Sequence, residues 1–106
     1  MLVVSRFRVP GAEAEEFRAG IDRAHEALAA CPGYVAGAVG RNVDEPELWV
    51  LTTTWENVGS YRRALSSYDV KLRAVAVLSR ALDEPSAYEL VTGETVLNIG
   101  SPRSLG

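Results

Sequence analysis

Residues 48–82 constrain the fold of this chain more than any other part of its sequence. They open with an alternating strand, Leu48–Trp55, which two amphipathic helical patterns follow directly. Its large apolar side chains fall on both sides of the strand, Leu48 and Val50 on one and Trp49, Leu51 and Trp55 on the other. A sheet that packs one face against its own helices leaves the second face bare, so we expect a second subunit or a ligand to cover that face.

Composition limits the class of protein. The chain has 106 residues, of which 47% are hydrophobic, and this suits one domain with a single core. A formal net charge of −3, with 11 basic residues spread along the chain, provides no basic patch for nucleic acid or an anionic membrane. No apolar run approaches the roughly 20 residues of a membrane span and the first residues read as a strand, so we expect a cytoplasmic protein. A single cysteine excludes an intrachain disulfide. With one cysteine and one histidine the chain has neither a cysteine cluster nor a histidine pair, so we expect no protein-ligated metal.

The first half of the chain predicts a strand, a helix and a hairpin. Residues 2–9 alternate as a strand, and an amphipathic helix runs from Ala12 to the terminating sequence Cys31-Pro32-Gly33, where glycine accepts a left-handed turn. Residues 34–43 and 47–55 then predict an antiparallel hairpin. Its first strand lacks side chains at Gly37 and Gly40, which leaves room there for another element or a ligand.

The second half predicts two helices and a last strand. Apolar spacing marks a short helix by Val58, Tyr61 and Leu65, and a second one by Tyr68, Leu72, Val75, Leu78 and Leu82. Ser66, Ser67 or Asp69 can cap the start of the second helix. Residues 86–91 follow as a short strand, and residues 92–106 as an extended tail.

The resulting order, βαββαβ, is the ferredoxin-like α+β arrangement of a four-stranded antiparallel sheet with its helices on one face. We expect one domain over residues 1–91. The opposite face must receive some of the side chains of Val4, Arg6, Trp49, Leu51 and Tyr88. Packing this face against a symmetry mate is the simplest way to remove it from water, and we therefore predict a homodimer built sheet to sheet.

Four sequence motifs carry a likeness to a known family. They are the opening strand LVVSRFRV, the turn Cys31-Pro32-Gly33-Tyr34, the strand that ends at Trp55, and the following W-E-x-x-x-x-Y-R. Over residues 2–91 the chain resembles the antibiotic biosynthesis monooxygenase (ABM) family of dimeric α+β barrels. The resemblance implies cofactor-independent oxidation of a phenol- or quinol-type aromatic molecule by O₂, with no cofactor. The same superfamily holds haem-degrading enzymes and members without known activity.

The resemblance also implies positions for a site. In the polyketide-oxidising relatives an asparagine, a tryptophan, a tyrosine and an arginine line the pocket, and Trp55 and Tyr61 stand at the tryptophan and tyrosine positions. Leu51 takes the place of the asparagine and Val75 that of the arginine, with Arg73 nearby. Haem degradation would need an axial histidine in residues 68–82, which contain none.

The candidate site residues follow from these positions and from side-chain chemistry. The candidates for catalysis are Trp55, Tyr61 and His25, whose ordinary pKa range suits a general base. The candidates for substrate binding are Tyr68, Arg73, Leu51, Phe17 and Leu72. The alternative function is a non-catalytic domain of the same fold that binds a small ligand or serves as a dimeric interaction module. An enclosed pocket with an inward polar group favours the enzyme, whereas a solid core favours the alternative.

Overall fold

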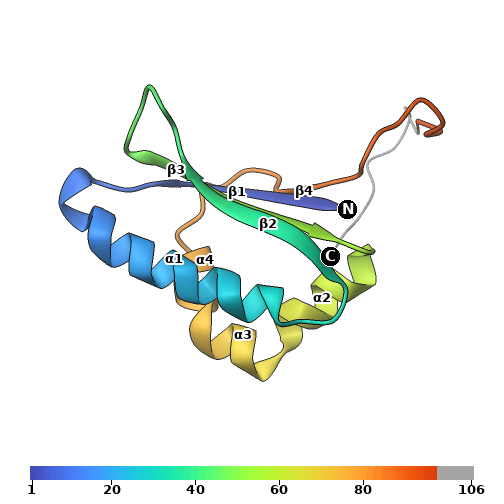
Figure 1. Cartoon of the computed structure of the whole chain (residues 1–106), viewed down its shortest axis with the longest axis horizontal. Helices are drawn as coiled ribbons and strands as arrows, with labels where there is room; N and C mark the ends of the chain where they lie inside the picture. The colour runs from blue at the N-terminus through green and yellow to red at the C-terminus, as the bar shows by residue number, and fades with distance from the viewer. Residues whose placement is uncertain (98–106) are drawn as a thin grey trace.

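The computed structural model describes residues 1–97 (Figure 1). Its elements are β1 (Leu2–Arg8), the 3-10 turn η1 (Gly11–Glu13), α1 (Ala14–Ala29), β2 (Tyr34–Arg41), β3 (Leu48–Trp55), α2 (Val58–Ser66), α3 (Tyr68–Arg73), α4 (Val75–Leu78) and β4 (Ala87–Tyr88). The strands form one antiparallel sheet in the order β2-β3-β1-β4. This confirms the ferredoxin-like α+β prediction. Of the predicted tail, residues 98–106 lie outside the described part.

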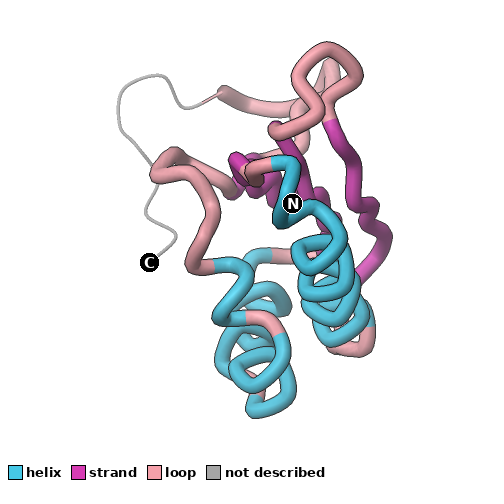
Figure 2. The backbone as a smooth tube through the Cα atoms, turned by 90° about the vertical axis from the view of Figure 1, so that its left-hand side faces the viewer, coloured by secondary structure: helices cyan, strands magenta, loops and turns pink. Residues whose placement is uncertain are grey.

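All helices lie on one face of the sheet, as both views show (Figures 1 and 2). The core between the two layers is made by the alternate residues of β1 and β3 and by the inner face of α1, with Phe7, Trp49 and Phe17 in mutual ring contact. Burial of such large apolar side chains is the main source of stability in a domain of this size. Within residues 1–97, no helix is both long and apolar enough to cross a bilayer.

Local sequence signals fix the end of α1 and the starts of α2 and α3. Gly33 has a φ of 89°, as predicted for the left-handed turn after α1, and a Cβ there would overlap Ser60 at the start of α2. Asn57 caps α2 by accepting a hydrogen bond from the Ser60 N–H, and Ser67 caps α3 by accepting one from the Val70 N–H. These caps set where α2 and α3 begin, and hence which of their side chains face the sheet.

The expectation about the bare face holds for some of the five residues given for it. Trp49 and Leu51 do not contribute to it, because both point toward the helices and are buried. The bare face instead carries Val4 and Arg6 of β1, together with Tyr88 of β4, as the alternating register requires. Since β3 alternates strictly, its two tryptophans share the helix-covered side with Leu51.

The predicted helix over residues 68–82 is also wrong in its extent and its inner face. It breaks at Ala74 into α3 and α4, and the chain turns again before residue 82. Tyr68 and Leu72 are 80% and 68% exposed, while Val70 and Ala74 are buried against α1. The Ser67 cap fixes where α3 begins and therefore which of its side chains face α1. The inward residues, Val70 and Ala74, are smaller than Tyr68 and Leu72, so that α3 can approach α1 more closely.

The last strand is shorter than predicted. Instead of residues 86–91, β4 contains only Ala87–Tyr88, which pair with Val3 and Leu2. Because β4 runs antiparallel to β1, each further residue of β4 would need a partner earlier in β1. Tyr88 already pairs with Leu2, the first residue of β1, so the residues after Tyr88 have no strand partner there. Leu90 and Val91 are consequently exposed.

Candidate active site

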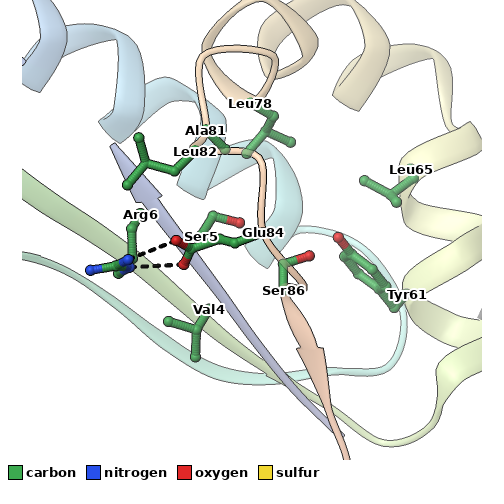
Figure 3. A pocket seen from close by; sticks show the side chains of 10 residues that line it. All are labelled: Val4, Ser5, Arg6, Tyr61, Leu65, Leu78, Ala81, Leu82, Glu84 and Ser86. Carbon is green, nitrogen blue, oxygen red and sulfur yellow. Dashed lines mark hydrogen bonds and ion pairs between the residues drawn. The ribbon is translucent and has the colours of Figure 1, made fainter. Parts of the chain in front are cut away.

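A pocket of about 230 Å³ lies where the edge of β1 is no longer paired with β4. It is a partly open pocket bordered by β1, α2, α4 and the segment of residues 79–86 that leads to β4 (Figure 3). The residues that line it are Val4, Ser5, Arg6, Tyr61, Leu65, Leu78, Ala81, Leu82, Glu84 and Ser86. It therefore joins segments from both ends of the chain.

The wall of the pocket combines apolar and polar groups. Leu65 and Leu78 supply apolar surface, while Tyr61, Ser86 and Glu84 bring polar atoms (Figure 3). Tyr61 stands at one end of the pocket in this view and the Glu84 carboxylate lies toward the other. A hollow that offers both apolar surface and a set of converging polar groups can bind a small organic molecule and fix its orientation.

Arg6 and Glu84 form a bidentate ion pair at the pocket. The Arg6 Nε and Nη2 atoms donate to Oε2 and Oε1 of Glu84 at 2.8 and 2.6 Å. The hydrogen bonds from Arg6 lower the pKa of Glu84, and the same pairing raises that of Arg6. Backbone bonds from Leu82 N–H to the Arg6 carbonyl and from Val4 N–H to the Ser86 carbonyl fasten the same segment to β1.

Behind Tyr61, aromatic side chains continue in a row away from the pocket. The ring centroids of Tyr61 and Trp55 are 5.6 Å apart, and those of Trp55 and Tyr34 are 5.5 Å apart in an edge-to-face contact. The Tyr34 hydroxyl lies 2.8 Å from Nε2 of His25 on α1. Trp55 is 1% exposed, and its Nε1 donates to the Thr53 Oγ1 at 2.9 Å.

Gly37 makes the end of this row possible. A Cβ at this position would lie 2.6 Å from the Tyr34 hydroxyl and from the Thr52 carbonyl oxygen, and 2.9 Å from Nε2 of His25. Only glycine leaves enough space for the hydrogen-bonded pair above β2. The prediction that this glycine makes room for another element is confirmed, and the element is α1.

Burial changes the acidity of two tyrosines in the row. Desolvation raises the pKa of Tyr61 and that of Tyr34 above the ordinary value of 10.0. Both phenols therefore keep their protons at neutral pH. Tyr61 meets the pocket as a neutral hydroxyl that can donate a hydrogen bond, and Tyr34 can donate to His25.

The structure brings only some of the predicted site residues together. Tyr61 lines the pocket, Trp55 touches Tyr61, and His25 is linked to Trp55 through Tyr34. Leu51 and Phe17 are buried in the core and are not among the residues that line the pocket, although Leu51 pairs with Ser5 of the lining across the two strands. Their part in substrate binding, like that of the residues described next, stays a prediction.

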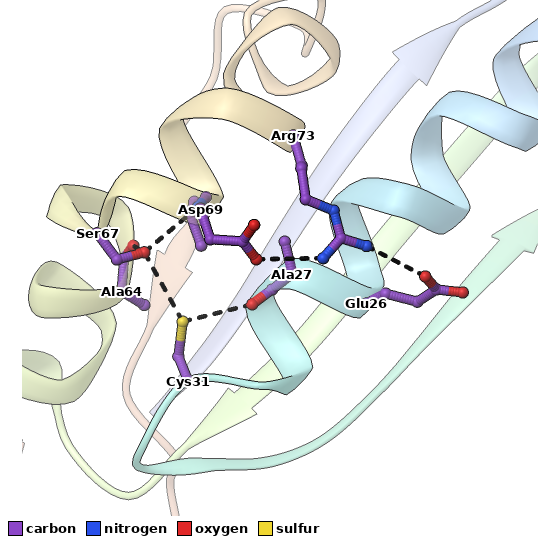
Figure 4. Close-up of polar contacts among 8 residues, drawn as sticks. Glu26, Ala27, Cys31, Ala64, Ser67, Asp69 and Arg73 are labelled. Atoms are coloured by element: carbon purple, nitrogen blue, oxygen red, sulfur yellow. Dashed lines mark hydrogen bonds and ion pairs between the residues drawn. The ribbon is translucent and has the colours of Figure 1, made fainter.

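The three predicted residues of α3 lie outside the pocket lining. Tyr68 and Leu72 point to solvent. Arg73 donates to Asp69 at 3.1 Å and to Glu26 of α1 at 3.2 Å (Figure 4). These ion pairs are largely exposed and hold the guanidinium on the surface between α3 and α1.

Sequence reasoning missed Arg6, Glu84, Tyr34 and Thr53 as parts of this region. Arg6 and Glu84 are 78 positions apart, and nothing in their local sequence connects them. The sequence places Tyr34 in the turn motif and at the start of the predicted strand 34–43. The signal for its contact is His25, nine positions earlier across a glycine turn. Thr53 gave the clearest signal, because it sits two residues before Trp55 on the same face of the strand.

Comparisons with known proteins agree on the family. The family model "Antibiotic biosynthesis monooxygenase" (ABM) matches residues 1–72. SnoaB, a cofactor-independent oxygenase from Streptomyces nogalater, is 29% identical in sequence; the match covers 91% of this chain and 94% of SnoaB with a TM-score of 0.67. A conserved protein from Methanosarcina mazei Go1 shares the fold at 22% identity, with 81% and 84% coverage and a TM-score of 0.67. No match was found among curated proteins. With most of its length matched by the family model, the chain belongs to the antibiotic biosynthesis monooxygenase family.

Proposed function

We propose that this protein is a cofactor-independent monooxygenase that oxidises a phenol- or quinol-type aromatic molecule with O₂. The observation that carries the proposal is the pocket of about 230 Å³ on an ABM framework, in which Tyr61 shares the lining with apolar residues such as Leu65 and with the polar side chain of Glu84. SnoaB, a cofactor-independent oxygenase with the same fold, supports it further.

In this reaction the substrate itself supplies the electrons. A phenol with a free C–H position loses its hydroxyl proton, and the resulting anion passes one electron to O₂. The substrate radical and superoxide then combine to form a C–O bond. Loss of the ring proton and of water leaves a quinone carbonyl, so that one oxygen atom enters the product and the other leaves as water. No external reductant is required.

The pocket offers groups suited to this sequence. Tyr61, whose pKa is raised by burial, stays neutral and can donate a hydrogen bond to the substrate anion or to the reduced oxygen. Glu84, whose pKa is lowered by Arg6, stays ionised and can accept a hydrogen bond from a substrate hydroxyl. Because its pKa is lowered, Glu84 is a weak base. It is better suited to orient the substrate hydroxyl than to hold the proton that the hydroxyl loses. Apolar residues such as Leu65 and Leu78 keep water from the radical pair.

A second function fits one specific observation. Leu51, at the position where the polyketide-oxidising relatives carry asparagine, is buried in the core, and Arg73 is engaged by surface carboxylates. A domain of this kind would bind an aromatic ligand in the same pocket without oxidising it. The two functions differ in whether O₂ is consumed when the ligand is bound.

The proposal includes a homodimer formed through the bare face of the sheet. Leu2, Val4 and Val50 are only half-buried there, and Tyr88 is exposed at its edge. Covering these side chains with a second copy removes apolar area from water. Light scattering at micromolar concentration tests the dimer, and a mass near that of one chain would contradict it.

Oxygen consumption with a panel of hydroquinones and anthrone-type phenols tests the oxygenase. We expect uptake by the wild type and a fall in kcat/KM of about 100-fold in Tyr61→Phe, because the variant loses a donor that acts on developing charge. Tyr68→Phe removes the same hydroxyl from an exposed position and should behave as wild type. Absence of uptake with every compound, together with ligand binding by calorimetry, would leave the non-catalytic function in its place.

A further inference from the structure

The aromatic row runs from the pocket beside β1 to Tyr34 on β2, an edge strand of the sheet. Tyr61 lines the pocket, Trp55 is fully buried behind it, and Tyr34 is half-buried at the far end. Successive ring centroids lie 5.6 and 5.5 Å apart. Electron tunnelling weakens exponentially with distance, so rings in contact exchange electrons far faster than rings separated by aliphatic packing.

The three rings differ in what their oxidation requires. A tyrosine is readily oxidised only if a base takes its phenolic proton, whereas a tryptophan can form a radical cation and keep its N–H. Within residues 1–97 the structure gives the Tyr61 hydroxyl no hydrogen-bond partner, and the Trp55 N–H is bound to the Thr53 hydroxyl, which is no base. Tyr34 alone has a base, Nε2 of His25 at 2.8 Å.

This difference gives the row a direction. An oxidising equivalent that arises in the pocket can pass by way of the Tyr61 ring to Trp55, which can be oxidised without losing its proton. From Trp55 it can fall to Tyr34, where transfer of the proton to His25 makes the oxidation easiest. The Tyr34 hydroxyl and His25 Nε2 are packed closely over Gly37, where any side chain would collide with both of them. Desolvation keeps the Tyr34 phenol protonated before the transfer.

We propose that Tyr61, Trp55 and Tyr34 form an electron-transfer path that carries oxidising equivalents out of the pocket to a redox-active Tyr34–His25 pair. The inference rests on the proposed function, because the oxidant would be the alkoxyl or hydroxyl radical released when the O–O bond of the peroxide intermediate breaks homolytically instead of losing water. That oxidant gains one electron, and Tyr34 loses one electron through Trp55 and its phenolic proton to His25. A neutral tyrosyl radical and an imidazolium result. A small reductant such as ascorbate or a thiol returns the electron from solvent, and His25 returns the proton.

Flash photolysis tests the path without a substrate. A ruthenium polypyridyl sensitiser is attached to Ser86→Cys at the pocket, in a protein that also carries Cys31→Ser, Tyr68→Phe and Tyr88→Phe. The background leaves Tyr34 and Tyr61 as the tyrosines of a chain that has four. The readouts are the transient absorption and the EPR spectrum that distinguish a tyrosyl radical from a tryptophan radical.

We expect a tyrosyl radical in this background and its loss in Tyr34→Phe, where a tryptophan radical should persist instead. His25→Gln keeps a hydrogen-bond acceptor but takes no proton, so the tyrosyl signal should also be lost while circular dichroism stays unchanged. The same sensitiser on Glu15→Cys, at the start of α1, is the control for transfer through solvent. It should give no Tyr34 radical.

An isosteric 3-fluorotyrosine at position 34 protects the test against a misfolded variant. Fluorine hyperfine structure in the EPR spectrum should appear if the radical sits on this residue. A tyrosyl spectrum without fluorine coupling, or an undiminished signal in Tyr34→Phe, would overturn the path. Because the assay needs no substrate, a Tyr34 radical in a protein that consumes no O₂ would refute the proposed function and leave the path standing.

Discussion

The two tryptophans of β3 point to the same face of the sheet, six residues apart, yet their surroundings differ. Trp49 is packed against Phe17, which in turn touches Phe7, with Arg41 stacked over the Trp49 ring at 5.7 Å. Trp55 is bounded by Tyr34, Tyr61 and Thr53, each of which brings a hydroxyl, and the pocket begins beyond Tyr61. Around Trp49 the neighbouring rings are those of phenylalanine, whereas around Trp55 every one of these neighbours carries a hydroxyl group.

The largest expected effect is among the phenylalanine rings around Trp49. Phe17→Ala removes a ring that is 2% exposed and should lower the free energy of unfolding by about 3–5 kcal/mol, without direct effect on the pocket. Urea denaturation followed by fluorescence measures it. Leu72→Ala is the control, since an exposed side chain should cost less than about 0.5 kcal/mol. Equal costs for the two would mean that the core does not lie where the structure places it.

The next effect concerns the glycine above which Tyr34 and His25 meet. Gly37→Ala should destabilise the protein by about 1–3 kcal/mol, because the new Cβ meets a backbone carbonyl as well as two side-chain atoms. Gly40→Ala in the same strand places its Cβ 3.2 Å from a single Val50 methyl and should cost less. Thermal unfolding of both variants gives the comparison, and a tolerated Gly37→Ala would contradict the close packing of the pair.

Thr53→Val separates hydrogen bonding from packing at Trp55. The substitution keeps the shape of the side chain but leaves the buried Trp55 N–H without its acceptor, at a cost of about 1–2 kcal/mol. Thr52→Val, on the other face of the same strand, removes a longer and exposed hydrogen bond and should be nearly neutral. Chemical denaturation measures both, and a neutral Thr53→Val would show that the indole is held by packing alone.

The smallest effect is that of the ion pair at the pocket. Because Arg6 lowers the pKa of Glu84, its ionised form favours the folded state; this contribution is complete above the ordinary carboxyl pKa of 4.5 and is lost as the pH falls through the lower folded-state value. Wild type should thus exceed Glu84→Gln in stability at neutral pH, and the difference should shrink in acid. Melting temperatures across this range test it, and a constant difference would exclude the pair as its source. Asp83→Asn, next to it but exposed, is the control.

The sequence predicts most of the sheet because its signals are local. Alternation in β3 and the glycine at position 33 each determine a conformation through neighbours in the chain. The inner face of α3 could not be predicted in this way. Tyr68 and Leu72 are the larger apolar residues, but the Ser67 cap and the contact with α1 select Val70 and Ala74 instead.

The pocket was less accessible to prediction than the fold. Tyr61 was found because it follows Trp55 at a recognisable spacing, whereas Arg6 and Glu84 meet only after the whole chain has folded. The role of Arg73 in substrate binding stays a prediction. Glu26 and Asp69 bind this side chain on the surface, and the arginine that lines the pocket, Arg6, comes from β1.

Product analysis after reaction with isotopically labelled O₂ tests the central claim, that the pocket lined by Tyr61 is an oxygenase site. Wild type incubated with an anthrone-type phenol should yield the quinone with one labelled oxygen atom, and Tyr61→Phe should yield far less in the same time. A quinone without label, or equal labelled product from both proteins, would contradict the account.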